Sequence, residues 1–226
     1  MPQIVSKSYF NKNNGLYIPM SVEHPTSVTA QASPNFASAL ELLCIKVEKE
    51  ILLNALGLAT YNALQLALAD IDNPLYASYK KLVQGDEYDG KIWNGLDYDY
   101  SLIAYRVYEL FRTATESQTT STGETKVNTQ NASNYSPAYK IADANQQFLL
   151  QYQGGYCHYP MVSIIDGVEF VDWVGSAEGV NVSFYQYMND KKADFVDFDR
   201  DGDTNYWSIE KFRIYGENEF KNSFGL

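Results

Sequence analysis

Residues 33–57 have the sequence SPNFASALELLCIKVEKEILLNALG, and this stretch decides the fold. Ser33 and Pro34 have the form of a helix N-cap followed by proline at the first helical position. The apolar residues that follow recur at helical spacing: Phe36, Leu40, Leu43, Val47 and Ile51. Gly57 is a typical helix stop. The stretch therefore predicts an amphipathic helix that ends near Gly57.

The same period continues along the chain. Four further segments show it: Leu58–Ala69, a short helix from Asn73-Pro74 to Gly85, residues 98–113, and a last helix from Ser136-Pro137 to Gly154-Gly155. We therefore predict a mainly α fold in which residues 35–154 form a compact helix bundle.

The segments outside these helices have other patterns. Residues 1–34 show no helical period and carry three prolines, so they predict an extended N-terminal arm that only a partner orders. Residues 115–135 are polar, as in functional or disordered loops, and the Thr-rich halves around Gly123 are able to pair as a β-finger. Residues 155–226 alternate short apolar runs with Gly and Asp. They predict a tail of strands and loops, with one helical turn around Ser183–Met188.

Composition limits the function classes. The 226 residues carry 17 basic and 28 acidic side chains, a net charge of −11, which argues against tight binding of nucleic acid. Uninterrupted apolar stretches such as Ile51–Leu53 are far shorter than the ~20 residues of a membrane span, so we expect no transmembrane helix. The first ten residues do not resemble a secretory signal, so we expect a cytosolic protein in which Cys44 and Cys157 are reduced.

Tyrosine is unusually frequent, with 19 residues against 11 phenylalanines and 3 tryptophans. Tyrosine suits subunit interfaces, where an apolar ring and a polar tip must both be accommodated. The same side chain also suits the edge of a core. The tyrosine content is therefore compatible with assembly and with ordinary packing alike.

Residues for catalysis are scarce. The chain holds two histidines, His24 and His158, neither of which has a partner at metal-ligand spacing. Cys157 adjoins His158, but sequence adjacency does not supply the third group that orients a nucleophile and its base. Phosphate-binding loops of the known kinds are absent from the sequence. We therefore do not expect an enzyme, and a hydrolase that uses Cys157 and His158 is the weakest alternative.

The strongest local motif is the acidic run 197–203, DFDRDGD. Asp197, Asp199 and Asp201 occupy positions one, three and five of a calcium loop, with Gly202 at position six. Position twelve requires a glutamate but holds Ser208. The run is therefore either a Ca2+ site or a solvated acidic loop, and a calcium-dependent binding module at residues 194–205 is the alternative function.

Several segments, taken in order, resemble the helical head-to-tail connector family of tailed bacteriophages. They are LNALGLATYNAL at 53–64, LVQGDEY at 82–88 and GLDYDYSLIAYRVY at 95–108. The polar loop with Gly123, the helix that Ser136-Pro137 opens, SFYQYMND at 183–190 and NSFGL at 222–226 are similar to the version carried by phages of Bacteroidetes, including crAss-like phages. The likeness covers roughly residues 36–226, and the arm and the long acidic tail depart from the short members.

The resemblance implies that the helix bundle at residues 35–154 is antiparallel. It also implies a non-enzymatic virion protein, made in the host bacterial cytoplasm and located in the neck or tail region. Copies of it are expected to form a dodecameric ring beneath the portal protein. That ring extends the DNA conduit and presents a surface to the next neck or tail protein, while DNA passes without specific binding. The resemblance brings no catalytic residue, no cofactor and no membrane contact.

Overall fold

Five α-helices make up most of the part of the chain that the computed structural model describes, namely residues 2–11, 15–18, 34–120, 123–126, 138–154, 162–165, 168–171, 181–195 and 198. The helices are α1 Pro34–Ala69, α2 Ala77–Gln84, α3 Leu102–Glu116, α4 Ala138–Gln153 and α5 Phe184–Asp190. The prediction of a mainly α bundle is confirmed.

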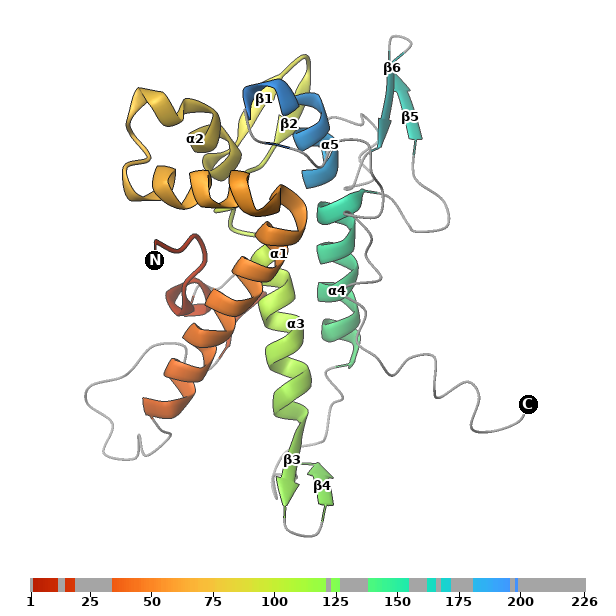
Figure 1. The fold of residues 1–226 in the computed structure, drawn as a ribbon. Helices are drawn as coiled ribbons and strands as arrows, with labels where there is room; N and C mark the ends of the chain where they lie inside the picture. The colour runs from red at the N-terminus through yellow and green to blue at the C-terminus, as the bar shows by residue number, and fades with distance from the viewer. Residues whose placement is uncertain are drawn as a thin grey trace.

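The helices lie in two layers (Figure 1). In one layer the first half of α1 packs against α3, and α3 packs antiparallel against α4. The second layer contains the rest of α1, α2, a β-hairpin and α5 (Figure 1). Fully buried aliphatic and aromatic side chains join the helices of the first layer, among them Ile51, Val107 and Phe148. The apolar stripes that the sequence displays are therefore the faces that meet in the core.

Gly57 separates the two halves of α1. Its φ of 76° and ψ of 170° are not helical, and residues other than glycine scarcely adopt them. The two helices predicted on either side of Gly57 are therefore confirmed, and they meet there at a sharp bend (Figure 1). This bend turns the second half of α1 away from α3 and starts the second layer.

The helix predicted after Asn73 also forms. The Asn73 side chain accepts a hydrogen bond from the amide of Leu75 at 3.1 Å, and a 3-10 turn at Pro74–Tyr76 leads into α2. Gly85, with a φ of 104°, ends α2. A Cβ at this position would lie 2.9 Å from the carbonyl oxygen of Trp93, so glycine also allows the following hairpin to approach.

That hairpin was not predicted. Strands β1 Asp86–Tyr88 and β2 Lys91–Trp93 pair antiparallel, with Asp86 opposite Trp93. Asp89 and Gly90 form the turn with positive φ values of 47° and 74°. An Asp-Gly pair is the usual signal of a two-residue hairpin turn. Here the pair lies in an acidic stretch, and the sequence analysis used only the charge of that stretch.

The predicted two-stranded finger is present. Strand β3 Ser117–Thr120 continues directly from α3 and pairs antiparallel with β4 Gly123–Lys126. Gly123 pairs with Thr120, so it lies in the strand ladder and not in the turn. The finger projects beyond the end of α3, away from the second layer (Figure 1).

The N-terminal arm differs from the expectation. Residues 7–11 form a short 3-10 helix, and five apolar residues of the segment are buried in the chain's own core: Val5, Tyr9, Phe10, Leu16 and Ile18. The expectation that only a partner orders the arm is therefore wrong for residues 2–11 and 15–18. Their apolar residues follow no period, but they are numerous enough to join the core beside α1.

The tail contributes to the same core. Ser183 caps α5 by accepting a hydrogen bond from the amide of Gln186 at 3.1 Å, which confirms the predicted helical turn. Phe184, Tyr187 and Met188 are fully buried among bundle residues. Two short strands, β5 Val162–Ile165 and β6 Val168–Val171, pair as a hairpin within the predicted strand region. Residues 199–226 of the predicted tail lie outside the described residues.

One helix is more apolar than expected. Over Ser38–Ala69, α1 reaches a mean hydropathy of 1.4 in an 18-residue window, which meets the length and composition of a membrane span. Half of that window is buried inside the protein, and the core helix of a globular protein passes the same test. The expectation that no helix qualifies was based on uninterrupted apolar runs. It missed residues 51–69, which hold no charged side chain and whose apolar residues are interrupted only by glycine and uncharged polar residues.

Candidate assembly surfaces

The candidate metal-binding and catalytic residues of the sequence analysis lie outside the described part of the chain. This holds for Asp197, Asp199 and Asp201, and also for His24, Cys157 and His158. Among the residues that the structure does describe, no group of three or more His, Cys, Asp or Glu side chains is placed to hold a metal. The calcium loop therefore stays a prediction, and the described residues offer contact surfaces instead.

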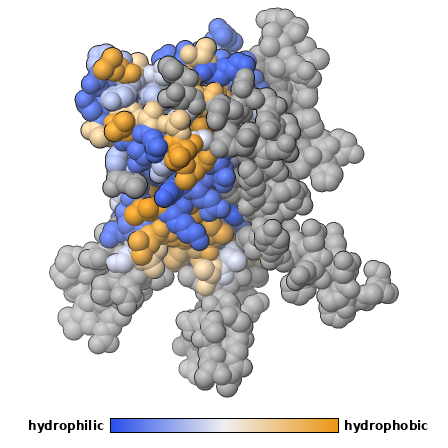
Figure 2. All heavy atoms as spheres, viewed as in Figure 1, coloured by the Kyte–Doolittle hydropathy of each residue, from blue (hydrophilic) through white to orange (hydrophobic). Residues whose placement is uncertain are grey.

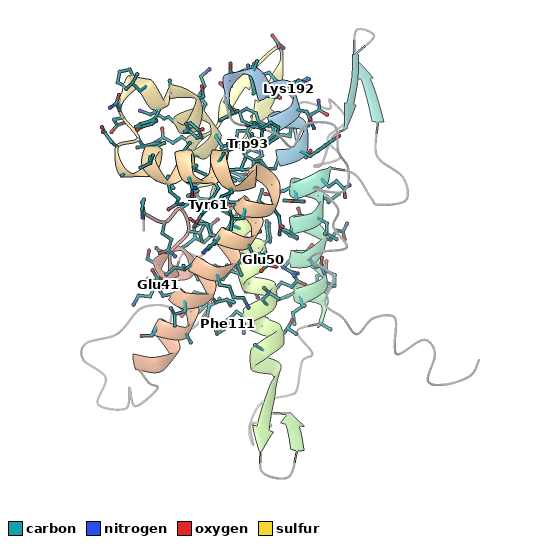
Figure 3. All side chains as sticks on the ribbon, in the orientation of Figure 1. Glu41, Glu50, Tyr61, Trp93, Phe111 and Lys192 are labelled. Atoms are coloured by element: carbon teal, nitrogen blue, oxygen red, sulfur yellow. The ribbon has the colours of Figure 1, made fainter. Side chains whose placement is uncertain are left out.

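The first surface holds the N-terminal segment on α1. The Glu48 carboxylate accepts hydrogen bonds from the backbone amides of Ile4 at 3.0 Å and Val5 at 3.1 Å. The Glu41 carboxylate accepts one from the amide of Lys7 at 2.8 Å. Glu41 and Glu48 lie seven positions apart, two helical turns, and so share one side of α1. Figure 3 shows Glu41 on the side of α1 along which the segment runs. We call Glu41, Glu48 and residues 4–7 the N-terminal clasp.

Burial dominates the electrostatics of this clasp. Glu48 is 4% exposed, and desolvation raises the pKa of its carboxyl to about 7 even though the amides of Val5 and Ile4 favour the charged form. Glu41 adds a smaller repulsion that acts in the same direction as burial. An ionised carboxylate in this place is therefore costly, and the paired amides are what make it tolerable.

Cys44 lies on α1 between the two clasp carboxylates. Its side chain has no exposed surface, and burial, with help from Glu41 and Glu48, raises the pKa of the thiol to about 12. A thiol with these properties is protonated and unreactive. The carboxylates on either side of Cys44 along α1 are the ones that bind the amides of the N-terminal segment.

The far end of the segment contacts the loop before α3. The Tyr9 hydroxyl donates to the carbonyl oxygen of Tyr98 at 2.9 Å and accepts from the amide of Ser101 at 3.3 Å. The amide of Ile18 donates to the carbonyl oxygen of Phe10 at 3.0 Å, which folds the segment back on itself. The segment therefore bridges α1 and the start of α3.

A second cluster joins the β1–β2 hairpin to α5. The Trp93 ring stacks on Phe184 and Tyr187, with centroid distances of 5.6 and 5.2 Å, and its indole N–H donates to the carbonyl oxygen of Leu82 at 2.9 Å. Figure 3 places Trp93 at the junction of the hairpin and α5. One side chain thus ties together α2, the hairpin and the tail.

Polar contacts complete this junction around Asp190. The Tyr88 hydroxyl donates to the Asp190 carboxylate at 2.9 Å, and the Lys91 ammonium lies 2.7 Å from the same carboxylate. The Lys191 ammonium lies 4.3 Å from the centroid of the Tyr88 ring. These contacts are partly solvated and add specificity more than stability.

The acidic stretch between residues 86 and 99 has one largely buried carboxylate and four exposed ones. The Asp86 side chain is largely buried and lies 3.2 Å from the ammonium of Lys81. The other four carboxylates are exposed: Glu87, Asp89, Asp97 and Asp99. The hairpin turn and the loop before α3 therefore present an acidic surface.

Large apolar side chains are also exposed on α1 and the turn after it. Leu42 is 67% exposed and Ile45 43%, and the two lie three positions apart on one side of the first half of α1. Leu58 at 66% and Leu66 at 65% lie on the second half, and Leu75 at 85% follows. Figure 2 shows apolar residues at the surface among hydrophilic ones. We call these five residues the outer apolar set.

Comparisons of the chain with protein-family models, with curated proteins and with solved structures return no match.

Proposed function

We propose that the chain is a structural subunit of a ring, a head-to-tail adaptor that lies beneath the portal of a tailed bacteriophage and extends its DNA conduit. The observation that carries this proposal is the outer apolar set. Five large aliphatic residues, each at least 43% exposed, lie along one kinked helix and the turn after it. A contiguous exposed apolar surface is typical of protein–protein contacts, and we propose that these five residues contribute to such a surface in the ring.

The order of elements supports the same proposal. The sequence segments that resemble the connector family fall on the kinked α1, on α2 with its hairpin, on α3 and on α5. These are the elements that form one joined core. The resembling segments at 53–64, 82–88, 95–108 and 183–190 therefore belong to one structural unit, whereas the segment at 222–226 lies outside the described residues.

The finger and the acidic surface suit a conduit. A two-stranded finger projects from the end of α3 (Figure 1), and we propose that it reaches a neighbouring subunit or the lumen. Exposed carboxylates at the hairpin repel DNA phosphates, so a lumen that carries them lets DNA pass instead of holding it. We accordingly propose that the portal protein, further copies of this chain and the next neck or tail protein are its partners.

Substitutions in the outer apolar set test the proposal. A variant with Leu42→Asp and Ile45→Asp places two charges where an apolar contact is proposed, and its assembly is measured by size exclusion with light scattering. Lys46→Asp is the matched control, because Lys46 is an exposed neighbour on the same helix. We expect the double variant to remain folded by circular dichroism and to lose assembly, while the control assembles. Assembly of the double variant at the wild-type concentration would contradict the proposal.

A further inference from the structure

The loop between β2 and α3 displays two tyrosine rings at the surface. Tyr98 is 36% exposed and Tyr100 40%, and the centroids of the two rings lie 5.8 Å apart. Asp97 and Asp99 alternate with the tyrosines and are exposed as well. Tyrosine is enriched at subunit contacts because it combines an apolar ring with a polar hydroxyl. Residues 97–100 therefore carry the chemistry of a contact surface, and we call them the tyrosine loop.

The backbone of the tyrosine loop is held by other parts of the chain. The carbonyl oxygen of Tyr98 accepts hydrogen bonds from the Tyr9 hydroxyl at 2.9 Å and from the amide of Ser101 at 2.8 Å. The carbonyl oxygen of Tyr100 accepts one from the side chain of Gln151, on α4, at 2.8 Å. Because the backbone is fixed before any partner binds, the loop loses little conformational entropy when it enters a contact.

One side of α1 has the complementary chemistry. Leu42, Ile45 and Lys49 are spaced by three and four positions, so they form one line along the helix surface. All three are exposed, Leu42 at 67% and Ile45 at 43%. Lys46 lies about 100° round the helix from Ile45 and is outside this line. We call Leu42, Ile45 and Lys49 the α1 row, which presents an apolar surface next to a positive charge.

We infer that the α1 row of one subunit binds the tyrosine loop of a second copy of this chain. The spacing of the two surfaces agrees, because side chains three positions apart on a helix have Cβ atoms about 5–6 Å apart and the two tyrosine rings are separated by 5.8 Å. The rings can therefore cover Leu42 and Ile45 together. The carboxylates beside the rings are opposite in charge to Lys49, which favours this partner and this orientation.

A second copy is the partner because each chain carries both halves of the contact. The α1 row and the tyrosine loop are both exposed in the subunit, so the row does not cover its own loop. Two different surfaces give a head-to-tail contact, in which each subunit binds one neighbour by its row and the other by its loop. Contacts of this kind generate a ring when the rotation between neighbours closes.

The inference rests on the proposed function, because it names the two surfaces that would build the proposed ring. The carboxylates of the β1–β2 hairpin, Glu87 and Asp89, are not part of this contact. They are left to line the lumen.

Complementation between two variants tests the inference. The row variant carries Leu42→Asp and Ile45→Asp, and the loop variant carries Tyr98→Ser and Tyr100→Ser. Each variant keeps one half of the contact, so each alone should remain a single subunit in size exclusion with light scattering. In an equal mixture, the intact row of the loop variant should bind the intact loop of the row variant. We expect a species of two chains and nothing larger, because the outer surfaces of that pair are both disabled.

Controls and the wild type define the result. Circular dichroism checks that both variants are folded, and Tyr139→Ser, which removes a tyrosine that is 75% exposed on α4, should assemble as the wild type does. A mixture that stays as single subunits while the wild type forms rings would overturn the inference and leave the proposed function standing. A dimer of the loop variant alone would also overturn it, since the row would then bind itself. A wild type that never assembles would overturn both.

Reversal of charge gives a second, independent measurement. Lys49→Glu and Asp99→Lys should each raise the concentration at which half of the protein is assembled by about fivefold, because each places like charges in the contact. The chain with both substitutions should return to within about twofold of the wild type. Lys140→Glu, at an exposed position on α4, is the control and should have no effect. Losses that add up in the double variant, without recovery, would overturn the inference.

Discussion

The Glu48 carboxylate accepts a hydrogen bond from the amide of Val5 at 3.1 Å, across 43 positions of sequence. Both residues are buried, and Glu48 is one of the few charged side chains in the core of the described residues. This contact joins the N-terminal segment to the first helix. The stability of the segment on the bundle is therefore expected to depend on that carboxylate.

Glu48→Ala is expected to loosen the segment. It leaves the buried amides of Ile4 and Val5 without their acceptor, which costs about 1–3 kcal/mol. The rate at which a maleimide modifies Cys44, measured in a Cys157→Ser chain, should rise by between about fivefold and a hundredfold. Glu50→Ala, at an exposed position two residues away, is the control and should leave the rate unchanged. Equal rates in both variants would show that Glu48 does not hold the segment.

The pH dependence of stability has a defined sign. Burial raises the Glu48 pKa from 4.5 to about 7, so the folded chain holds more protons than the unfolded chain between those values. The free energy of unfolding should therefore fall as pH rises from 4.5 to 7, by up to about 1.4 kcal/mol per pH unit. Glu41, Cys44 and Tyr61 are the other titratable groups near this carboxyl.

Urea unfolding of the wild type and of Glu48→Gln between about pH 5 and pH 8 measures this effect. Subtracting the free energy of unfolding of Glu48→Gln from that of the wild type at each pH cancels the titration of the groups that both proteins share. We expect the wild type to lose stability relative to Glu48→Gln across this range. A constant difference would mean that the carboxyl keeps its ordinary pKa in the folded chain.

The bend in α1 provides a third prediction. Gly57→Ala forces a side chain into a backbone region that is almost restricted to glycine, at a cost of about 1–3 kcal/mol. Gly90→Ala is the control, because Gly90 also has a positive φ but a Cβ there meets nothing within 4 Å. We expect denaturant unfolding to show a larger loss for Gly57→Ala. A smaller loss than in the control would argue that α1 straightens without penalty.

Much of this fold was predictable because its helices carry their own start and stop signals. Proline after Ser33, proline after Asn73, and glycine at positions 57 and 85 gave the helices around them nearly as they are observed. The hairpin at residues 86–93 was not predicted, although Asp89-Gly90 is a recognisable turn signal. These turn residues lie among acidic side chains, and the stretch was interpreted by its charge alone.

The N-terminal clasp was not predictable in the same way. Glu41 and Glu48 lie on a helix rich in other charges, and nothing local shows that they bind the amides of residues 4–7. Their spacing of seven, with Cys44 between them, places two carboxylates on a partly apolar side of the helix, and this was the one available signal. Contacts between segments so distant in sequence depend on the tertiary fold.

The acidic surface leads to a prediction about DNA. With a net charge of −11 and exposed carboxylates at residues 87, 89, 97 and 99, the isolated protein should not retard duplex DNA in a gel at physiological salt. In the assembled ring, at least one of the acidic stretches 86–99 and 194–203 should face the lumen. A salt-dependent gel shift would contradict the first statement, and a lumen lined by lysine or arginine would contradict the second.

The central claim is that this chain forms a ring on a portal. Electron microscopy of the full-length protein, mixed with the portal protein of its virus, tests that claim most directly. The account predicts closed rings of twelve copies stacked coaxially on the portal, with the bundles side by side around the lumen. Portal particles that carry no added density, together with free single subunits at every concentration tried, would contradict it.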